Sequence, residues 1–310
     1  MAPQPPKAFA DLQSAVHEPG TLSQALQAFH SPCGERPHGL TWYDVILVNS
    51  SAGKDSQAML TELVRRADLE GVRDRLVVVH ADLGRVEWPG TKDLARRQAA
   101  HYGLRFESMA RPQGDLLAHI EQRGMFPSST TRYCTSDHKR GQVAKVITML
   151  VGEWRERNRD SWGTPPTRTC RVLNCLGIRA QESRARAKKT PLVLDTRLTN
   201  SKRTVTTWFP IFDWTTDQVW RVIRASGVEH HEAYDHGMPR LSCVFCVFAP
   251  KSALTIAGRH NPDLLDEYVA LEARIGHTFT HTMSIASVRD AIRSGAPVTV
   301  TDDDAADWCM

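Results

Sequence analysis

The sequence lacks the features of membrane-bound and secreted proteins. No stretch of its 310 residues approaches the roughly 18 consecutive apolar residues of a membrane-spanning helix. The opening, MAPQPPKAFADLQ, has no apolar core of the kind found in secretory signals. Cysteine is scarce as well, because seven are too few for a disulfide scaffold of this length, and we expect them to be buried, reactive or metal-bound. These absences predict a cytoplasmic protein without a membrane partner.

A strong net charge is also absent. The chain carries +4 at pH 7, with 24% charged and 41% hydrophobic residues, which is ordinary for a globular protein and identifies no partner. The stretch 179–203 is locally basic, with two acidic residues, Glu182 and Asp195. Its basic residues are Arg179, Arg184, Arg186, Lys188, Lys189, Arg197, Lys202 and Arg203. Such a stretch suits nucleic-acid phosphates, and it suits a solvated loop equally well.

The alternation of apolar runs and amphipathic segments indicates an α/β fold. The apolar runs are typical of strands buried in a parallel sheet. The expected strands are residues 44–49, 75–82, 104–110 and 172–179, and the expected helices are 56–69, 91–102 and 139–154. This order predicts a doubly wound, mostly parallel sheet.

The remaining segments set the expected domain boundaries. Residues 1–40 are rich in proline and predict a flexible leader. Residues 41–310 are expected to form one domain, with a helical part that starts at about residue 250. Two polar segments, 155–170 and 182–203, are expected to be surface loops.

A short motif, SAGKDS at residues 51–56, follows the first expected strand. The helix that comes next offers unpaired N–H groups and the positive end of its dipole, so the motif favours an anion. A Walker A loop is excluded, because it needs glycine and Ser or Thr where this chain has Val48 and Asp55. Taken alone, the motif fits a phosphate cradle and a simple capped turn about equally well.

The motif also resembles the PP-loop, S-G-G-x-D-S, of the ATP pyrophosphatases, with Ala52 in place of the first glycine. Five more blocks, in the same order, are similar to those of the phosphoadenosine phosphosulfate (PAPS) reductase branch. They are HADLGRVEWPGT (80–91), RYCTSDHKRGQV (132–143), LGIRAQESRAR (176–186), PIFDWTTDQVW (210–220) and YDHGMPRLSCVFC (234–246). The resemblance covers residues 42 to about 290 and implies an adenine nucleotide alpha hydrolase-like fold that binds ATP and Mg²⁺.

This resemblance implies a set of site residues. Those expected to bind ATP and Mg²⁺ are Ser51, Ala52, Gly53, Lys54, Asp55, Ser56, Asp82, Gly177 and Arg179. Those expected to act in catalysis are Lys54, Asp55, Ser56 and Arg179. Those expected to bind the acceptor or a second phosphate are Lys139, Arg140, Glu182 and Arg184. Residue chemistry allows plainer alternatives: Asp82 suits a ribose hydroxyl, Mg²⁺ or an exposed strand end, and the arginines suit a surface salt-bridge cluster.

Cysteine placement suggests a sulfur or metal centre. Cys243 and Cys246 form a C-x-x-C, and Cys134 lies where cluster-bearing reductases of this branch have a ligand. In that context the resemblance implies a [4Fe–4S] cluster, with zinc or a persulfide as alternatives. The reductases have a Cys-Cys pair where this chain has one cysteine, so either Cys175 or Cys170 supplies a fourth ligand or one iron stays open.

The resemblance as a whole implies an enzyme of sulfur chemistry. The leading interpretation is an ATP pyrophosphatase like the DndC/SspD proteins of DNA phosphorothioation, which adenylates an acceptor oxygen for sulfur insertion. Its expected partners are a cysteine desulfurase, other modification-system proteins and a nucleic acid, DNA before tRNA. A thioredoxin-dependent PAPS or adenylyl-sulfate reductase is the alternative, but the chain ends in DDDAADWCM without the reductases' E-C-G-(I/L)-H. The residues also fit a tRNA thiolase, or a non-enzymatic module that senses nucleotides or binds DNA and is stabilised by a structural zinc ion.

Overall fold

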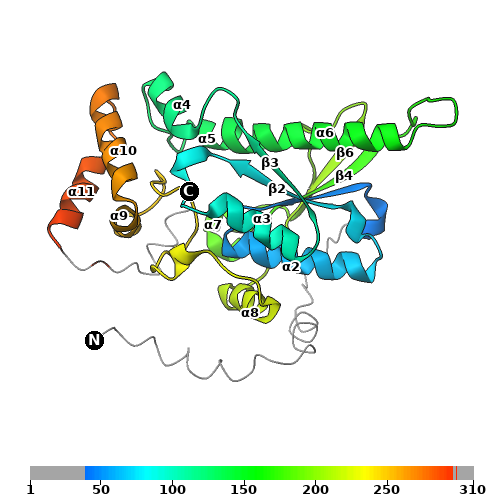
Figure 1. The fold of residues 1–310 in the computed structure, drawn as a ribbon, viewed down its shortest axis with the longest axis horizontal. Coiled ribbons are helices and arrows are strands. Elements are labelled where there is room, and N and C mark those ends of the chain that lie inside the picture. Colours follow the sequence, from blue (N-terminus) through cyan, green and yellow to red (C-terminus); the bar gives the residue numbers. More distant parts are fainter. Residues whose placement is uncertain (1–38, 296–297, 299–310) are drawn as a thin grey trace.

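We describe the chain from a computed structural model, which covers residues 39–295 and residue 298. The expected leader, residues 1–40, therefore lies almost wholly outside the described residues, and so does Cys309. Within the described part, helices cover both faces of a six-stranded sheet (Figure 1). None of the helices described there is both long enough and apolar enough to cross a bilayer.

The sheet is mostly parallel, which confirms the predicted fold class. Its strand order is β3-β2-β1-β4-β6-β5, and β5 pairs antiparallel with β6. The strands are β1 (Val45–Asn49), β2 (Leu76–Asp82), β3 (Arg105–Ala110), β4 (Cys170–Cys175), β5 (Leu192–Leu194) and β6 (Arg203–Trp208). The chain winds outward in opposite directions from β1 and β4. The crevice at the carboxyl ends of these two strands is the point where such sheets bind ligands.

Helices complete the two outer layers. They are α2 (Lys54–Leu69), α3 (Thr91–His101), α4 (Leu116–Arg123), α5 (Tyr133–Thr135), α6 (Gly141–Arg157), α7 (Arg184–Ala187), α8 (Thr216–Ser226), α9 (Lys251–His260), α10 (Pro262–Ile275) and α11 (Ile285–Arg293). Helices α2, α3 and α8 lie on one side of the sheet and α6 on the other (Figure 1). A π-helical turn, Ser136–Arg140, leads into α6.

The central strand β1 explains why the sheet is buried on both faces. Side chains of a strand alternate between its faces, and the four residues from Val45 to Val48 are all apolar. Ile46 and Val48 join the core on the α2 and α8 side, whereas Val45 and Leu47 join the core under α6. A continuous apolar run is therefore needed to fill both layers.

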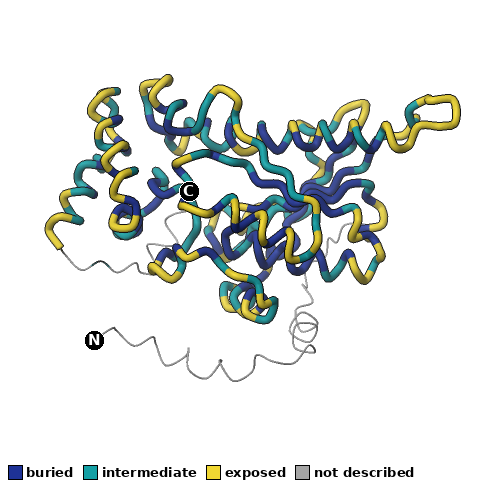
Figure 2. Tube along the Cα trace, in the orientation of Figure 1, coloured by how far each residue is buried: buried dark blue, intermediate teal, exposed yellow. Residues whose placement is uncertain are grey.

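The helical part after residue 250 has a hydrophobic core that is separate from the two cores of the sheet. Helices α4, α9, α10 and α11 contribute to it, together with the chain that precedes α9. Its centre is a group of aromatic rings: the ring centroids of Phe126 lie 5.3 Å from Phe279 and 6.1 Å from Tyr268. Figure 2 shows the buried inner side of these helices and their exposed outer side.

The structure differs from the sequence-based expectation at the far edge of the sheet. The segment 182–203 is predicted to be a loop, but it contains the edge strand β5. Strand β6, RTVTTW, has too few apolar residues to be recognised, and pairing with β4 along its whole length holds it in the sheet. Strand β4 ends at Cys175, so Arg179 lies beyond the sheet. The surface excursion predicted at 155–170 is shorter than expected: it spans residues 158–169 between α6 and β4, and Trp162 within it is 90% exposed.

Candidate functional site

The loop Ser51–Ser56 lies at the carboxyl end of β1, in the crevice next to β4. The loop is held by hydrogen bonds of its own residues: Ser56 Oγ donates to the carbonyl of Gly53 at 2.9 Å and accepts the N–H of Ser51 at 3.2 Å. Helix α2 begins at Lys54 with Gly53 as its N-cap. The amides of its first turn, which have no partner within the helix, and the positive end of its dipole therefore point toward the loop, which is the geometry of an anion cradle.

Ala52 adopts the conformation that a glycine would take here. Its φ of 56° is left-handed, a conformation that costs an alanine roughly 1 kcal/mol. The methyl group is fully buried and packs in a small cluster with Leu94 and Ala95. Burial of this methyl group offsets part of the strain, so the loop keeps a glycine-type backbone path despite the substitution.

Asp55 and Arg179 form an ion pair across the crevice. Arg179 Nε lies 2.6 Å from Asp55 Oδ1, and the guanidinium also donates to the carbonyl of Trp214 at 3.1 Å. Burial opposes the charge of Asp55, but Lys54 and Arg179 outweigh it and lower the pKa of this carboxyl. The pair therefore stays charged and ties the chain beyond β4 to the first turn of α2.

Gly177 permits this close approach. A Cβ atom on Gly177 would stand 2.9 Å from the carbonyl carbon of Asp55 and 3.0 Å from the amide nitrogen of Ser56. These neighbours are backbone atoms, which cannot move aside without shifting the start of α2. A glycine is thus required here by contact, although its backbone angle is not left-handed.

Lys54 turns its side chain into the protein. Its ammonium group donates to the carbonyl of Pro239 at 3.0 Å and lies 3.4 Å from Asp55 Oδ2. Burial lowers the pKa of Lys54, and the charge of Asp55 offsets part of that effect. A phosphate that recruits this lysine must therefore compete with the Pro239 carbonyl.

Asp82, at the carboxyl end of β2, is held beside this loop. It accepts hydrogen bonds from Lys92 Nζ at 2.8 Å and from the N–H of Gly84 at 2.9 Å. Burial opposes its charge, but these donors lower the pKa of Asp82. A charged carboxylate at this position suits Mg²⁺, provided that Lys92 moves away or shares the oxygen atoms.

Two further residues, which sequence reasoning passed over, connect the loop to the chain beyond β2. The buried ring of His80 places Nδ1 3.0 Å from the carbonyl of Ser50 and Nε2 3.1 Å from Glu87 Oε2. Burial opposes protonation of His80, yet Glu87 raises the pKa of the ring. The only sequence signal for this role is the position of His80 and Glu87 in the block HADLGRVEWPGT.

Glu182, predicted to bind the acceptor, is a buried anchor for three donor groups. It accepts the N–H of Arg179 at 2.9 Å and forms ion pairs with Arg186 and Arg240. Arg184 is exposed on α7, and Arg140 is exposed on the π-helical turn. Of the four residues predicted to bind the acceptor, Glu182 is thus internal, whereas Arg140 and Arg184 face solvent.

Three of the described cysteines lie near one another. Cys134, Cys243 and Cys246 all pack against the hydrophobic core of the helical part and are partly exposed. Desolvation opposes the charge of the Lys139 ammonium, but the nearby Cys243, Cys246, Cys134 and Glu87 raise its pKa. Burial raises the pKa of Cys243 to about 12, with Lys139 acting in the opposite direction. The Lys139 ammonium is therefore turned toward the thiols, although the residue as a whole is exposed.

Cys170 and Cys175 do not join this thiol group. Both are buried in β4, Cys170 in the core under α6 and Cys175 in the core under α2. The donor chemistry of the three grouped thiols suits iron or zinc. Among residues 39–295, however, no three Cys, His, Asp or Glu side chains are arranged to hold a metal ion. The three thiols of the described part of the chain are thus near one another but are not arranged as the ligands of one metal ion.

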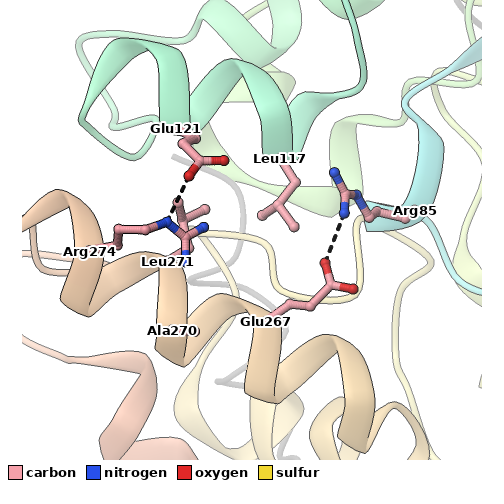
Figure 3. A pocket seen from close by; sticks show the side chains of 7 residues that line it. All are labelled: Arg85, Leu117, Glu121, Glu267, Ala270, Leu271 and Arg274. Carbon is pink, nitrogen blue, oxygen red and sulfur yellow. Dashed lines mark hydrogen bonds and ion pairs between the residues drawn. The ribbon is translucent and has the colours of Figure 1, made fainter.

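A small cavity of about 140 Å³ lies between α4 and α10, and its lining includes no residue of the loop and none of the three thiols (Figure 3). Two ion pairs cross it, Arg274 to Glu121 at 2.7 Å and Arg85 to Glu267 at 3.1 Å. Its charged groups are already paired, and its floor is formed by Leu117 and Leu271. It offers no group for phosphate or sulfur chemistry.

Comparison with known proteins places this site in context. The model of the phosphoadenosine phosphosulfate reductase domain family matches residues 45–249. An adenosine 5′-phosphosulfate reductase of Allochromatium vinosum is 26% identical over 210 residues, which cover 66% of this chain and 69% of the reductase. An uncharacterised protein of Escherichia phage 186 is 26% identical over 163 residues, 52% of this chain, and the match spans only 43% of the phage protein.

Among solved structures, a PAPS reductase from Candida auris in complex with phosphate aligns with a TM-score of 0.43 and 14% identity. The alignment covers 72% of this chain and 88% of that one.

Proposed function

Because the chain belongs to the phosphoadenosine phosphosulfate reductase domain family, we propose that it is an ATP pyrophosphatase that activates an acceptor oxygen for sulfur insertion. The observation that carries this proposal is the Ser51–Ser56 loop, from here on the PP-loop. It lies at the ligand-binding crevice of the sheet, and the chain that carries Cys243 is bonded to it. Because the chain that carries the thiols contacts the proposed nucleotide site, the arrangement suits a reaction in which adenylation of the acceptor is followed by sulfur transfer.

The nucleotide half of the reaction follows from the charges in the crevice. The amides at the start of α2, with the Ser51 and Ser56 hydroxyls, favour the phosphates of ATP. Asp82 is the group that would hold Mg²⁺, which supplies charge neutralisation when it is bound. An acceptor oxygen attacks the α-phosphorus, the bond to the bridging oxygen breaks, and pyrophosphate leaves. The acceptor is then linked to AMP, which a sulfur nucleophile can displace.

We place the acceptor on the exposed basic surface beside the crevice. Arg184, Lys188 and Lys189 face solvent on and just after α7, and Arg197 follows on the loop after β5. The neighbouring Val193 and Leu194 on the edge strand are about half exposed. Cations around an apolar strip suit a nucleic-acid backbone, since each phosphate contact adds affinity. A DNA phosphate oxygen is the acceptor that we propose, with tRNA as the alternative.

The thiol group is the proposed entry point for sulfur. A cysteine desulfurase would deliver sulfur as a persulfide to Cys134, Cys243 or Cys246, and Lys139 would stabilise the anionic form. A [4Fe–4S] cluster on these three residues is the alternative state of the centre. The thiols have the right chemistry for it but are not gathered around one point, so no step is assigned to it.

One assay tests the activation step. We expect the purified protein with α-labelled ATP and Mg²⁺ to release AMP and pyrophosphate, more rapidly with DNA present. Ser56→Ala should slow turnover while the far-UV circular dichroism stays unchanged. Sulfite production from PAPS with thioredoxin, in the absence of AMP release from ATP, would instead establish a reductase.

A further inference from the structure

The segment 234–246, which carries two of the three grouped thiols, is bonded directly to the first turn of α2. The hydroxyl of Tyr234 accepts the backbone N–H of Lys54 at 2.7 Å. The carbonyl of Pro239 accepts the ammonium of Lys54 at 3.0 Å. A Cβ atom on Gly53 would stand 3.3 Å from this hydroxyl and 3.4 Å from Leu241 Cβ, so the segment lies against the PP-loop.

The Tyr234 hydroxyl stands where a helix of this kind usually binds an anion. The N–H of Lys54 belongs to the first turn of α2, and such amides are the donors that phosphate oxygens take at helix N-termini. The lysine ammonium, which could add a positive charge to the same site, is directed to the Pro239 carbonyl instead. The amide and the ammonium of Lys54 are therefore both engaged by the thiol-bearing segment.

The same segment is also attached on its far side. Cys243 forms an isolated β-bridge with Glu87, and the N–H of Val244 donates to the carbonyl of Val86 at 2.8 Å. Glu87 in turn bonds His80, whose other nitrogen reaches the carbonyl of Ser50 just before the PP-loop. The thiol-bearing segment is thus joined to the PP-loop at two points, residue 54 and residue 50.

We propose that Tyr234 and Lys54 are positioning residues that couple occupancy of the PP-loop to the placement of Cys243 and Cys246. A polyphosphate in the loop takes the Lys54 amide from Tyr234 and the Lys54 ammonium from Pro239. The segment 234–246 then loses both of its bonds to Lys54 and shifts between its remaining attachments, the ion pair of Arg240 with Glu182 and the bridge to Glu87, which changes the access to the thiols. This inference rests on the proposed function in one respect only, that the loop binds a polyphosphate.

Three measurements on the full chain test it, with inorganic pyrophosphate and Mg²⁺ as the probe. Calorimetry gives the affinity, mass spectrometry follows alkylation of the peptide that holds Cys243 and Cys246, and tryptophan emission reports on Trp220. The ring centroid of Trp220 lies 5.1 Å from that of Tyr234. The emission change remains readable even if the thiols are blocked by metal. Its assignment to Trp220 is checked with Trp220→Phe, which should abolish the change.

We expect pyrophosphate to change the alkylation rate of the wild-type peptide and the tryptophan emission. Tyr234→Phe removes the competing hydroxyl, so it should bind pyrophosphate about fivefold more tightly, as the loss of one competing hydrogen bond implies. Its alkylation rate without ligand should already be close to the ligand-bound value of the wild type. Tyr102→Phe is the matched control, because its hydroxyl also bonds α2, through Thr61 at 2.8 Å, but away from the loop.

The outcomes separate this inference from the proposed function. Pyrophosphate that binds without changing alkylation or emission would overturn the coupling and leave the function intact. A weaker affinity in Tyr234→Phe would also overturn it, because the hydroxyl would then support the loop instead of competing for it. Absence of binding by both pyrophosphate and ATP would remove the function and the coupling together.

Discussion

At the scale of single residues, contact geometry decides what the site tolerates. Ala52 and Gly177 are both small, yet for opposite reasons. Ala52 occupies a left-handed backbone conformation with room for its methyl group, whereas Gly177 has an ordinary backbone angle and no room for one. A sequence shows the residue type at each position but not which of the two constraints applies.

Gly177→Ala should therefore disturb the PP-loop. The added methyl group would meet the backbone of Asp55 and Ser56 at about 3 Å, and relief of such overpacking typically costs about 1–3 kcal/mol. We expect a lower melting temperature and at least a tenfold loss of AMP release. Gly152→Ala in α6 is the control, since nothing lies within 4 Å and the helix should gain about 0.5–1 kcal/mol. Equal effects of the two substitutions would contradict the contact argument.

His138 should make the stability of the fold depend on pH. Its ring is fully buried and bonds His119 through Nε2 at 3.0 Å, and burial, aided by His119 and Arg111, lowers its pKa to about 4. The unfolded chain, with an imidazole pKa of about 6.5, takes up the proton first as the pH falls. Stability is therefore full above pH 6.5 and decreases down to pH 4, by about 3 kcal/mol.

Urea unfolding at pH 7 and pH 5 measures this effect. His138→Gln keeps a polar group at the position of Nε2 and should be less stable at pH 7, but its stability should change less between the two values of pH. A variant with the same pH dependence as the wild type would assign the effect to other groups.

At the scale of elements, helix ends and exposed segments can be tested separately from the site. Helix α8 begins with a capping box, in which Thr215 Oγ1 accepts the N–H of Gln218 at 3.2 Å and Gln218 Oε1 accepts the N–H of Thr215 at 2.6 Å. The spacing of Thr215 and Gln218 in TTDQVW matches the local pattern of such a cap. The strand β6 had no such local signal and needed its partner β4.

Thr215→Ala should lower stability without removing activity. Loss of an N-cap side chain typically costs about 1 kcal/mol, and α8 packs against α2, whose first turn forms the PP-loop. We expect a lower urea midpoint and nearly unchanged turnover below the unfolding transition. Thr190→Ala, on the exposed chain after α7, should change stability by no more than about 0.5 kcal/mol.

The basic surface after α7 gives a second test at this scale. Lys188→Glu with Lys189→Glu should weaken DNA binding and reduce the slope of log affinity against log salt by up to about 2, roughly one unit for each lost phosphate contact. Arg157→Glu with Arg159→Glu, both exposed at or just after the far end of α6, is the charge-matched control and should leave the slope unchanged. Fluorescence anisotropy with a labelled duplex measures both. An unaltered slope in the double variant would mean that this surface does not carry the acceptor.

At the scale of the whole molecule, the sheet layer and the thiol-bearing chain are bonded to each other at the crevice. The sheet and its helices supply the PP-loop, and the helical part supplies the surface against which the thiols pack. Whether the three thiols bind a metal therefore depends on how these two parts of the molecule pack together.

An absorption spectrum recorded under nitrogen should show a charge-transfer band if iron and sulfide are bound, and Cys243→Ala should abolish it. A featureless spectrum with one zinc per chain would establish a structural metal instead.

The amino-acid sequence was enough to predict the fold class and to locate the PP-loop between the first strand and the first helix of the sheet. Those features rest on local signals: apolar runs that must be buried on two faces, a turn with serine and glycine before a helix, and blocks of residues in a fixed order. Cys175, one of the two candidates for a fourth ligand, is instead buried in the core between β4 and α2.

Which of these residues contact one another became known from the folded chain. The Lys54 side chain turns inward to the carbonyl of Pro239, and the Tyr234 hydroxyl bonds the first amide of α2. Glu182 is not an exposed ligand, because it is buried and forms an ion pair with Arg240. These three pairs lie between 58 and 185 positions apart in the chain, and no local pattern records such distances. They become neighbours because the parallel strands bring their carboxyl ends to one edge, where loops from distant parts of the chain must pack together.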